Sequence, residues 1–167
     1  HGNNLKMRVA LLCHDFGKPL TPKEDWPAHH NHDELGEKPV REFCECLRIP
    51  RDIAKFALTC TREHMRIKQI DEMRPATIIK LVTRNTDLWD LFDMSAIDSM
   101  YRGGVIIYKE FNKLSKQYDL INKAESVCKE ITGDTLIAEG YTPEEMGGEN
   151  FGEFLLQRRI EKYVEMK

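Results

Sequence analysis

Apolar residues recur at intervals of three and four along most of this 167-residue chain, and no long stretch alternates strictly between apolar and polar positions. Such spacing is typical of amphipathic helices rather than strands. Glycine and proline positions then mark where the helices stop. We therefore expect an all-α chain, with helices over residues 5–14, 33–47, about 51–66, from 74 onward, 88–101, about 106–131 and about 151–164.

Two segments between these helices are rich in turn-forming residues, residues 19–32 and 140–148. Pro39 interrupts the second helical pattern, so we expect that helix to begin near Lys38 with Pro39 in its first turn. Apolar residues become sparser after Gly103. We accordingly divide the chain into a core, residues 1–104, and a C-terminal helical extension packed on it, residues 105–167.

The composition is that of an ordinary globular protein, with 41% hydrophobic and 32% charged residues. The longest apolar runs are far shorter than the roughly 20 residues that cross a bilayer, and from the polar first residues we expect no signal peptide. We therefore expect a cytoplasmic protein without a membrane partner. The five cysteines lack a Cys-x-x-Cys pair and are expected to be reduced thiols.

The formal net charge of −3 argues against a protein that coats nucleic acid. The charge is uneven, however, and basic residues gather between Arg62 and Arg84. This basic stretch is either a solvated helix face or a rim that attracts a phosphorylated substrate. Trp26 and Trp89 are more often packing residues in such settings than surfaces for stacking bases.

The segment Cys13-His14-Asp15-Phe16-Gly17-Lys18 ends the first apolar helix. Adjacent His and Asp residues can offer an imidazole nitrogen and a carboxylate oxygen to one cation, but an ion needs further ligands from elsewhere in the chain. Asp98 interrupts the apolar stretch 94–100, and a buried carboxylate requires a cation or hydrogen-bond donors.

Histidines outside this segment provide further nitrogen donors, at positions 30, 32 and 64. A mixed set of imidazoles and carboxylates suits transition metals or magnesium-like ions. A bound ion of this kind makes hydroxide available near neutral pH. The residues alone leave two interpretations open: a metal site, or ordinary surface histidines and an unrelated His-Asp pair.

The segment His14-Asp15-x-Gly-Lys resembles the signature of the HD phosphohydrolase superfamily. The chain is further similar to the C-terminal half of bacterial multifunctional CCA-adding tRNA nucleotidyltransferases. This resemblance covers essentially the whole chain and rests on residues 12–18, 20–22, 26–32, 47–50, 62–64, 74–81, 98, 102–103 and 148–159.

The resemblance implies an HD-domain helical bundle that binds a divalent metal ion (Ni, Mn or Mg). Its metal ligands would be His14, Asp15 and Asp98, with His32 and His64 binding a second ion or contacting phosphate. It also implies roles for cationic side chains near the substrate. The implied catalytic residues are Asp15, Lys18 and His64, and the implied substrate-binding residues are Lys18, Arg66 and Arg102.

The implied activity is metal-dependent hydrolysis of 2′,3′-cyclic phosphodiesters, 2′-nucleotides or other phosphate esters, as part of tRNA 3′-end processing or repair. The implied partners are a phosphorylated nucleotide or a tRNA 3′ end, with a homodimer as a further possibility. The superfamily's first histidine precedes the His-Asp pair by more residues than His1 does, so we expect that ligand upstream of this chain. Nucleotide addition is not expected from this chain by itself.

Two other functions remain open. The chain could be a non-catalytic helical module for tRNA binding or dimerisation, or a regulatory domain that binds nucleotide without hydrolysing it.

Overall fold

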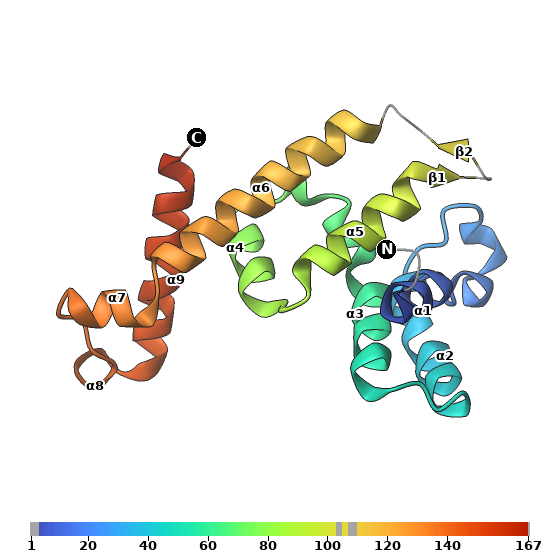
Figure 1. Cartoon of the computed structure of the whole chain (residues 1–167), viewed down its shortest axis with the longest axis horizontal. Helices are drawn as coiled ribbons and strands as arrows, with labels where there is room; N and C mark the ends of the chain where they lie inside the picture. Colours follow the sequence, from blue (N-terminus) through green and yellow to red (C-terminus); the bar gives the residue numbers. More distant parts are fainter. Residues whose placement is uncertain (1–3, 103–104, 107–109, 167) are drawn as a thin grey trace. The chain divides into compact units, whose positions relative to one another are not determined.

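The computed structural model describes residues 4–102, 105–106 and 110–166, and it confirms the all-α class (Figure 1). Its contacts divide the chain into two compact units. The first comprises residues 1–69 and 87–111, and the second comprises residues 70–86 and 112–167. The segment 70–86 thus groups with the C-terminal helices, whereas the predicted division at residue 104 remains a prediction.

The first unit is built around one central helix, α3 (Arg51–Ile67), which packs against three others. These are α1 (Leu5–Cys13), α2 (His32–Cys46) and α5 (Leu88–Met100). Two short 3-10 helices, η1 (Lys18–Leu20) and η2 (Lys23–Asp25), lie between α1 and α2. After α5 the chain forms a small antiparallel pair, β1 (Tyr101–Arg102) with β2 (Val105–Ile106).

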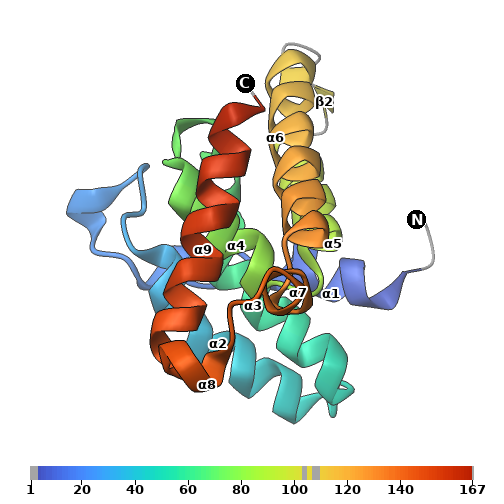
Figure 2. The same cartoon turned by 90° about the vertical axis from the view of Figure 1, so that its left-hand side faces the viewer.

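The second unit begins with η3 (Ile70–Glu72) and α4 (Pro75–Arg84), and α4 packs against the terminal helix α9 (Gly148–Glu165). Figure 2 shows α4 and α9 side by side. The long helix α6 (Phe111–Glu130) is followed by α7 (Gly133–Ala138) and the single turn α8 (Pro143–Met146). Residues Thr132 and Thr135 form a reciprocal capping box that starts α7.

Three helix boundaries differ from the prediction by more than two residues; one of them is the start of α9, at Gly148 rather than near Phe151. Helix α2 begins at His32, so Pro39 lies inside it rather than in its first turn. A proline there has no N–H for the carbonyl of Leu35, but that turn faces solvent, because Leu35 is exposed. The long polar helix begins at Phe111 rather than at Ile106, because Ile106 pairs with Tyr101 in the hairpin.

Two glycines allow the helices of the first unit to approach closely. A Cβ on Gly17 would lie 1.8 Å from the backbone oxygen of His32, and a Cβ on Gly36 would lie 2.7 Å from the methyl carbon of Thr61. Gly17 therefore brings the turn after α1 against the start of α2. Gly36 brings α2 against α3.

Small buried residues fill the space between these helices: Val9, Cys13, Val40, Cys44 and Ala57 form one core cluster. In the part of the chain that the structure describes, all five cysteines are free thiols, which agrees with the prediction. None of the described helices combines the length and the apolar character needed to cross a membrane.

Candidate metal centre

The first unit brings histidines from three helices together beside Asp15. His14 caps the C-terminus of α1, His32 opens α2, and His64 lies near the end of α3. All three side chains are buried, with 7%, 5% and 1% of their surface exposed. Three imidazoles are rarely buried together without partners, because each carries two polar nitrogens that need them.

The Asp15 carboxylate lies between two groups of ligands. Its Oδ2 is 3.3 Å from Nε2 of His14. Its Oδ1 faces the other histidines, 3.4 Å from Nε2 of His32 and 3.9 Å from Nε2 of His64. Asp98, from α5, completes the first group with its Oδ1 3.4 Å from Nε2 of His14. One carboxylate thus faces all three imidazoles.

The backbone determines which nitrogen of each histidine faces the cluster. Nδ1 of His14 lies 2.9 Å from the carbonyl oxygen of Leu11, and Nδ1 of His32 lies 2.8 Å from that of His29. Nδ1 of His64 lies 3.0 Å from the carbonyl oxygen of Thr61. A carbonyl oxygen only accepts, so each Nδ1 carries the proton, and each neutral ring presents its Nε2 lone pair to the cluster. Backbone bonds of this type orient metal-binding histidines.

The donor set fits a divalent cation. Nε2 of His32 and Nε2 of His64 are only 3.2 Å apart, and two lone pairs at that distance repel each other unless a proton or an ion lies between them. Nε2 of His14 is buried and faces two carboxylate oxygens, 3.3 Å from Oδ2 of Asp15 and 3.4 Å from Oδ1 of Asp98. Ligands about 2.1 Å from one ion are separated by roughly 3.0–3.4 Å in octahedral or tetrahedral arrangements, which is close to the separations here.

Within the described residues, ligand atoms of His14, Asp15 and His64 all lie within 4.8 Å of one another. These three could hold one ion. His32 adds its nitrogen beside His64, and Asp98 adds its oxygen beside His14. The two groups meet at Asp15, so the arrangement could hold one ion on either side of that carboxylate.

In the metal-free chain a proton bound to His14 can supply positive charge beside the two carboxylates. Burial disfavours the charged ring of His14, but the carboxylates of Asp15 and Asp98 outweigh this effect and raise its pKa to about 9. The reverse holds for His64, where burial and then the nearby charges of His14 and Lys68 lower the pKa to about 4. His64 is therefore a neutral donor at physiological pH.

Both carboxylates are stabilised in their charged form. Burial by itself would raise the pKa of each, but hydrogen bonding and charge from neighbouring cations lower both pKa values. For Asp15 these neighbours are His14 and Lys18, whose Nζ lies 2.5 Å from Oδ2. For Asp98 they are His14 and Lys68, which forms an ion pair with Oδ2. Anionic carboxylates are the form that binds a metal ion.

Lys68 is a site residue that sequence analysis placed only within the general basic stretch. It is the C-terminal cap of α3, thirty positions from Asp98 along the chain, and its side chain is mostly buried. Only the packing of α3 against α5 brings the two together. In the sequence, Lys68 is one of several basic residues in this stretch, and nothing distinguishes it from those exposed on the surface.

Two predicted substrate-binding arginines are not placed in this cluster. Arg66 is exposed and pairs with Glu63 on the surface of α3, with Nη1 2.9 Å from Oε2. The side chain of Arg102 lies outside the described residues.

His30 is exposed in the loop before α2, while His29 contacts Thr21, with Nδ1 2.7 Å from Oγ1. The contribution of His29 to the cluster is its carbonyl oxygen, which holds His32.

This fold and this set of histidines and carboxylates are those of an HD domain. The HD domain family model matches residues 1–95, and the chain belongs to that family. The matched segment includes helices α1, α2 and α3, together with His14, Asp15, His32 and His64. In general terms the chain is thus a phosphohydrolase-type HD domain whose side chains could hold a metal ion.

Its curated relatives include proteins named Multifunctional CCA protein. The one from Legionella pneumophila strain Paris is 38% identical over 142 residues, which cover 81% of this chain and 33% of that protein. The one from Acinetobacter baumannii strain ATCC 17978 is 32% identical over 169 residues, covering 98% of this chain and 39% of that protein. The chain therefore spans about a third of their length. No solved structure matches it.

Proposed function

We propose that this domain is a metal-dependent phosphohydrolase that acts on nucleotide phosphate esters, with 2′,3′-cyclic nucleotides, 2′-nucleotides and terminal phosphates of RNA as substrates. The observation that carries this proposal is the convergence of three buried Nε2 atoms on the Asp15 carboxylate. The resemblance to CCA-adding proteins supports tRNA 3′-end processing as the setting. A divalent ion bound here would supply Lewis-acid polarisation of a phosphoryl oxygen and acidification of water.

The chain's own residues have distinct tasks in this proposal. His14, Asp15 and Asp98 would hold the ion, with His32 and His64 on the other side of Asp15. Because the pKa of His64 is about 4, this side chain acts as a neutral ligand rather than as a proton donor.

Lys18 is the cation best placed to stabilise charge on a phosphoryl group. Its side chain is 42% exposed, so it can reach solvent and substrate while its ammonium contacts Asp15. An ammonium fixed beside the reacting group stabilises the negative charge that develops in the transition state. Lys68 is more buried, and by holding Asp98 it orients that carboxylate toward His14. Arg66 and Arg102 remain proposals for contacts with more distant parts of a substrate.

The test is turnover of 2′,3′-cyclic AMP by the purified chain with nickel, manganese or magnesium. We expect product only with added metal, and loss of turnover in the double variant His14→Ala, Asp15→Ala with helicity retained. The exposed loop variant His30→Ala is the matched control and should keep full activity. Full activity in the double variant would refute the mechanism. Binding of nucleotide without turnover in any metal would favour the non-catalytic functions instead.

A further inference from the structure

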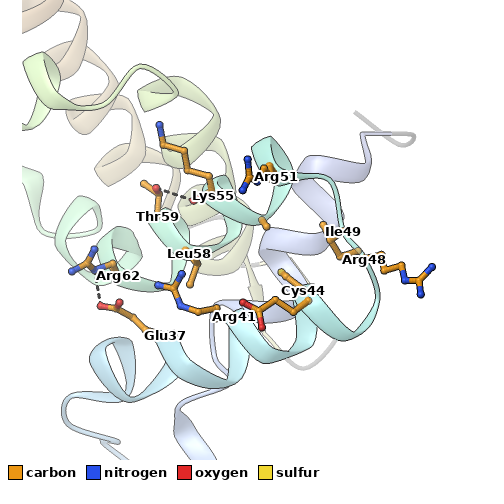
Figure 3. Close-up of a pocket in the computed structure, with 12 residues that line it drawn as sticks. Glu37, Arg41, Cys44, Arg48, Ile49, Arg51, Lys55, Leu58, Thr59 and Arg62 are labelled. Atoms are coloured by element: carbon orange, nitrogen blue, oxygen red, sulfur yellow. Dashed lines mark hydrogen bonds and ion pairs between the residues drawn. The ribbon is translucent and has the colours of Figure 1, made fainter.

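A second feature of the first unit lies outside the metal centre. Helices α2 and α3 border an open pocket of about 760 Å³, lined by the second half of α2, the turn at residues 48–49 and the first two-thirds of α3. None of the residues of the metal cluster lines it. Its volume is in the range of pockets that bind ligands. Figure 3 shows the side chains that surround it.

The rim of this pocket is strongly basic, in contrast to the chain's net charge of −3. Five of the lining residues are basic and two are acidic, Glu37 and Glu45. Glu37 is already paired with Arg62, with Oε1 2.6 Å from Nε. The other basic residues make no ion pair with any described carboxylate and are exposed; they are Arg41, Arg48, Arg51 and Lys55.

The floor of the pocket is apolar. Cys44 is buried there, and Ile49, Ala54 and Leu58 are partly buried and pack on the same core cluster. Figure 3 shows Leu58 and Arg41 among the side chains that line the pocket. A basic rim over an apolar floor matches a ligand that carries phosphate groups next to sugars and bases, because each part then meets a surface of its own kind.

The distribution of the unpaired cations indicates which ligand of this type fits best. Arg51 and Lys55 lie about 6 Å apart along α3, whereas Arg41 comes from α2 and Arg48 from the turn between the two helices. A single phosphate group offers too few oxygens to contact all four of these exposed side chains. A strand with several phosphates can do so, and unpaired Arg and Lys side chains are the groups that contact its backbone.

We propose that this α2–α3 pocket binds a single-stranded nucleic acid through its phosphodiester backbone, as a surface separate from the metal centre. Arg41, Arg51 and Lys55 supply the principal phosphate contacts, and Arg48 adds a further cation from the turn at residues 48–49. The proposal does not depend on hydrolysis at the metal centre. A strand held here would be recognised by charge and by contact with the apolar floor, with little preference for sequence.

The test is fluorescence anisotropy of the whole chain with a twelve-nucleotide RNA whose two ends are blocked, so that no terminal phosphate is present. We compare the unmodified chain with a pocket variant that carries both Arg51→Glu and Lys55→Glu. The control variant makes the same change of charge on two exposed lysines of the second unit, Lys80→Glu and Lys116→Glu. With four phosphate contacts, the logarithm of the binding constant should fall with the logarithm of salt concentration with a slope of about −2.8. The pocket variant should bind about tenfold more weakly and halve that slope.

The control variant should bind like the unmodified chain, and DNA of the same length should bind about as well as RNA. Equal loss in the control variant would overturn the proposal, as would no binding by the unmodified chain at low salt. Displacement of the strand by AMP at similar concentration would also overturn it, because the ligand would then be a free nucleotide. Turnover of 2′,3′-cyclic AMP should be unchanged in the pocket variant, so failure here is distinguishable from failure of the proposed hydrolase.

Discussion

Metal binding and protonation should compete at His14. The pKa of this side chain is about 9, so only about 1% of it is neutral at pH 7 in the metal-free chain. An ion can use Nε2 only after that proton leaves. We therefore expect each bound ion at His14 to release one proton at pH 7, and the affinity to rise about tenfold per pH unit between pH 7 and pH 9.

The measurement is isothermal titration calorimetry of manganese or nickel binding in two buffers of different ionisation enthalpy, which gives the number of protons released. His64 contributes none, since its pKa of about 4 leaves it neutral throughout this range. The variant Asp98→Asn removes one of the two carboxylates that raise the pKa of His14, so fewer protons should be released at pH 7. His30→Ala should change nothing. An affinity that stays flat between pH 7 and pH 9, with no proton released, would show that no proton on His14 competes with the metal ion.

The raised pKa of His14 also affects the stability of the metal-free chain. The pKa of His14 is higher in the folded state than its ordinary value of 6.5. Its contribution to the free energy of unfolding is therefore fully present below about pH 6.5 and is lost as the pH rises through about 9. In EDTA the melting temperature should fall between pH 6.5 and pH 9.5, and His14→Gln should make this fall smaller. If the melting temperature of the His14→Gln variant fell equally, other titrating groups would be its cause.

Three further predictions concern single substitutions, two in the first unit and one at the start of α7 in the second. Gly17→Ala places a Cβ against the backbone of α2 and should lower the free energy of unfolding, measured by urea titration, by about 1–3 kcal/mol. The control is Gly152→Ala in α9, where the added Cβ meets open space, so this variant should be neutral or slightly stabilising. Lys68→Met should weaken metal binding measured by calorimetry, because Asp98 loses the cation that orients it; unchanged affinity would contradict this. Thr132→Ala removes the cap of α7 and should cost about 1 kcal/mol in the same urea assay.

Much of the helical structure follows from local sequence. Apolar spacing predicts helices whose observed ends differ by one or two residues over most of the chain, as for α3 and α5. Local signals fail where a longer-range contact decides, as at Ile106, which pairs in a hairpin, and at Pro39, which is tolerated within α2. Both exceptions depend on what surrounds the backbone in three dimensions.

Local sequence suggested candidate metal ligands, because adjacent His and Asp side chains can offer two donor atoms to one ion, and an aspartate within an apolar stretch needs a cation or a hydrogen-bond donor. The residues alone left a chance His-Asp pair equally open, and the full ligand set came from the family resemblance. The sequence did not reveal how these residues converge. That depends on Gly17 and Gly36, which let three helices approach within the reach of one carboxylate. The ion pair of Lys68 with Asp98 and the α2–α3 pocket likewise form only when residues distant in sequence pack together. The charge and the volume at a site depend on how side chains pack, which their order along the chain does not give.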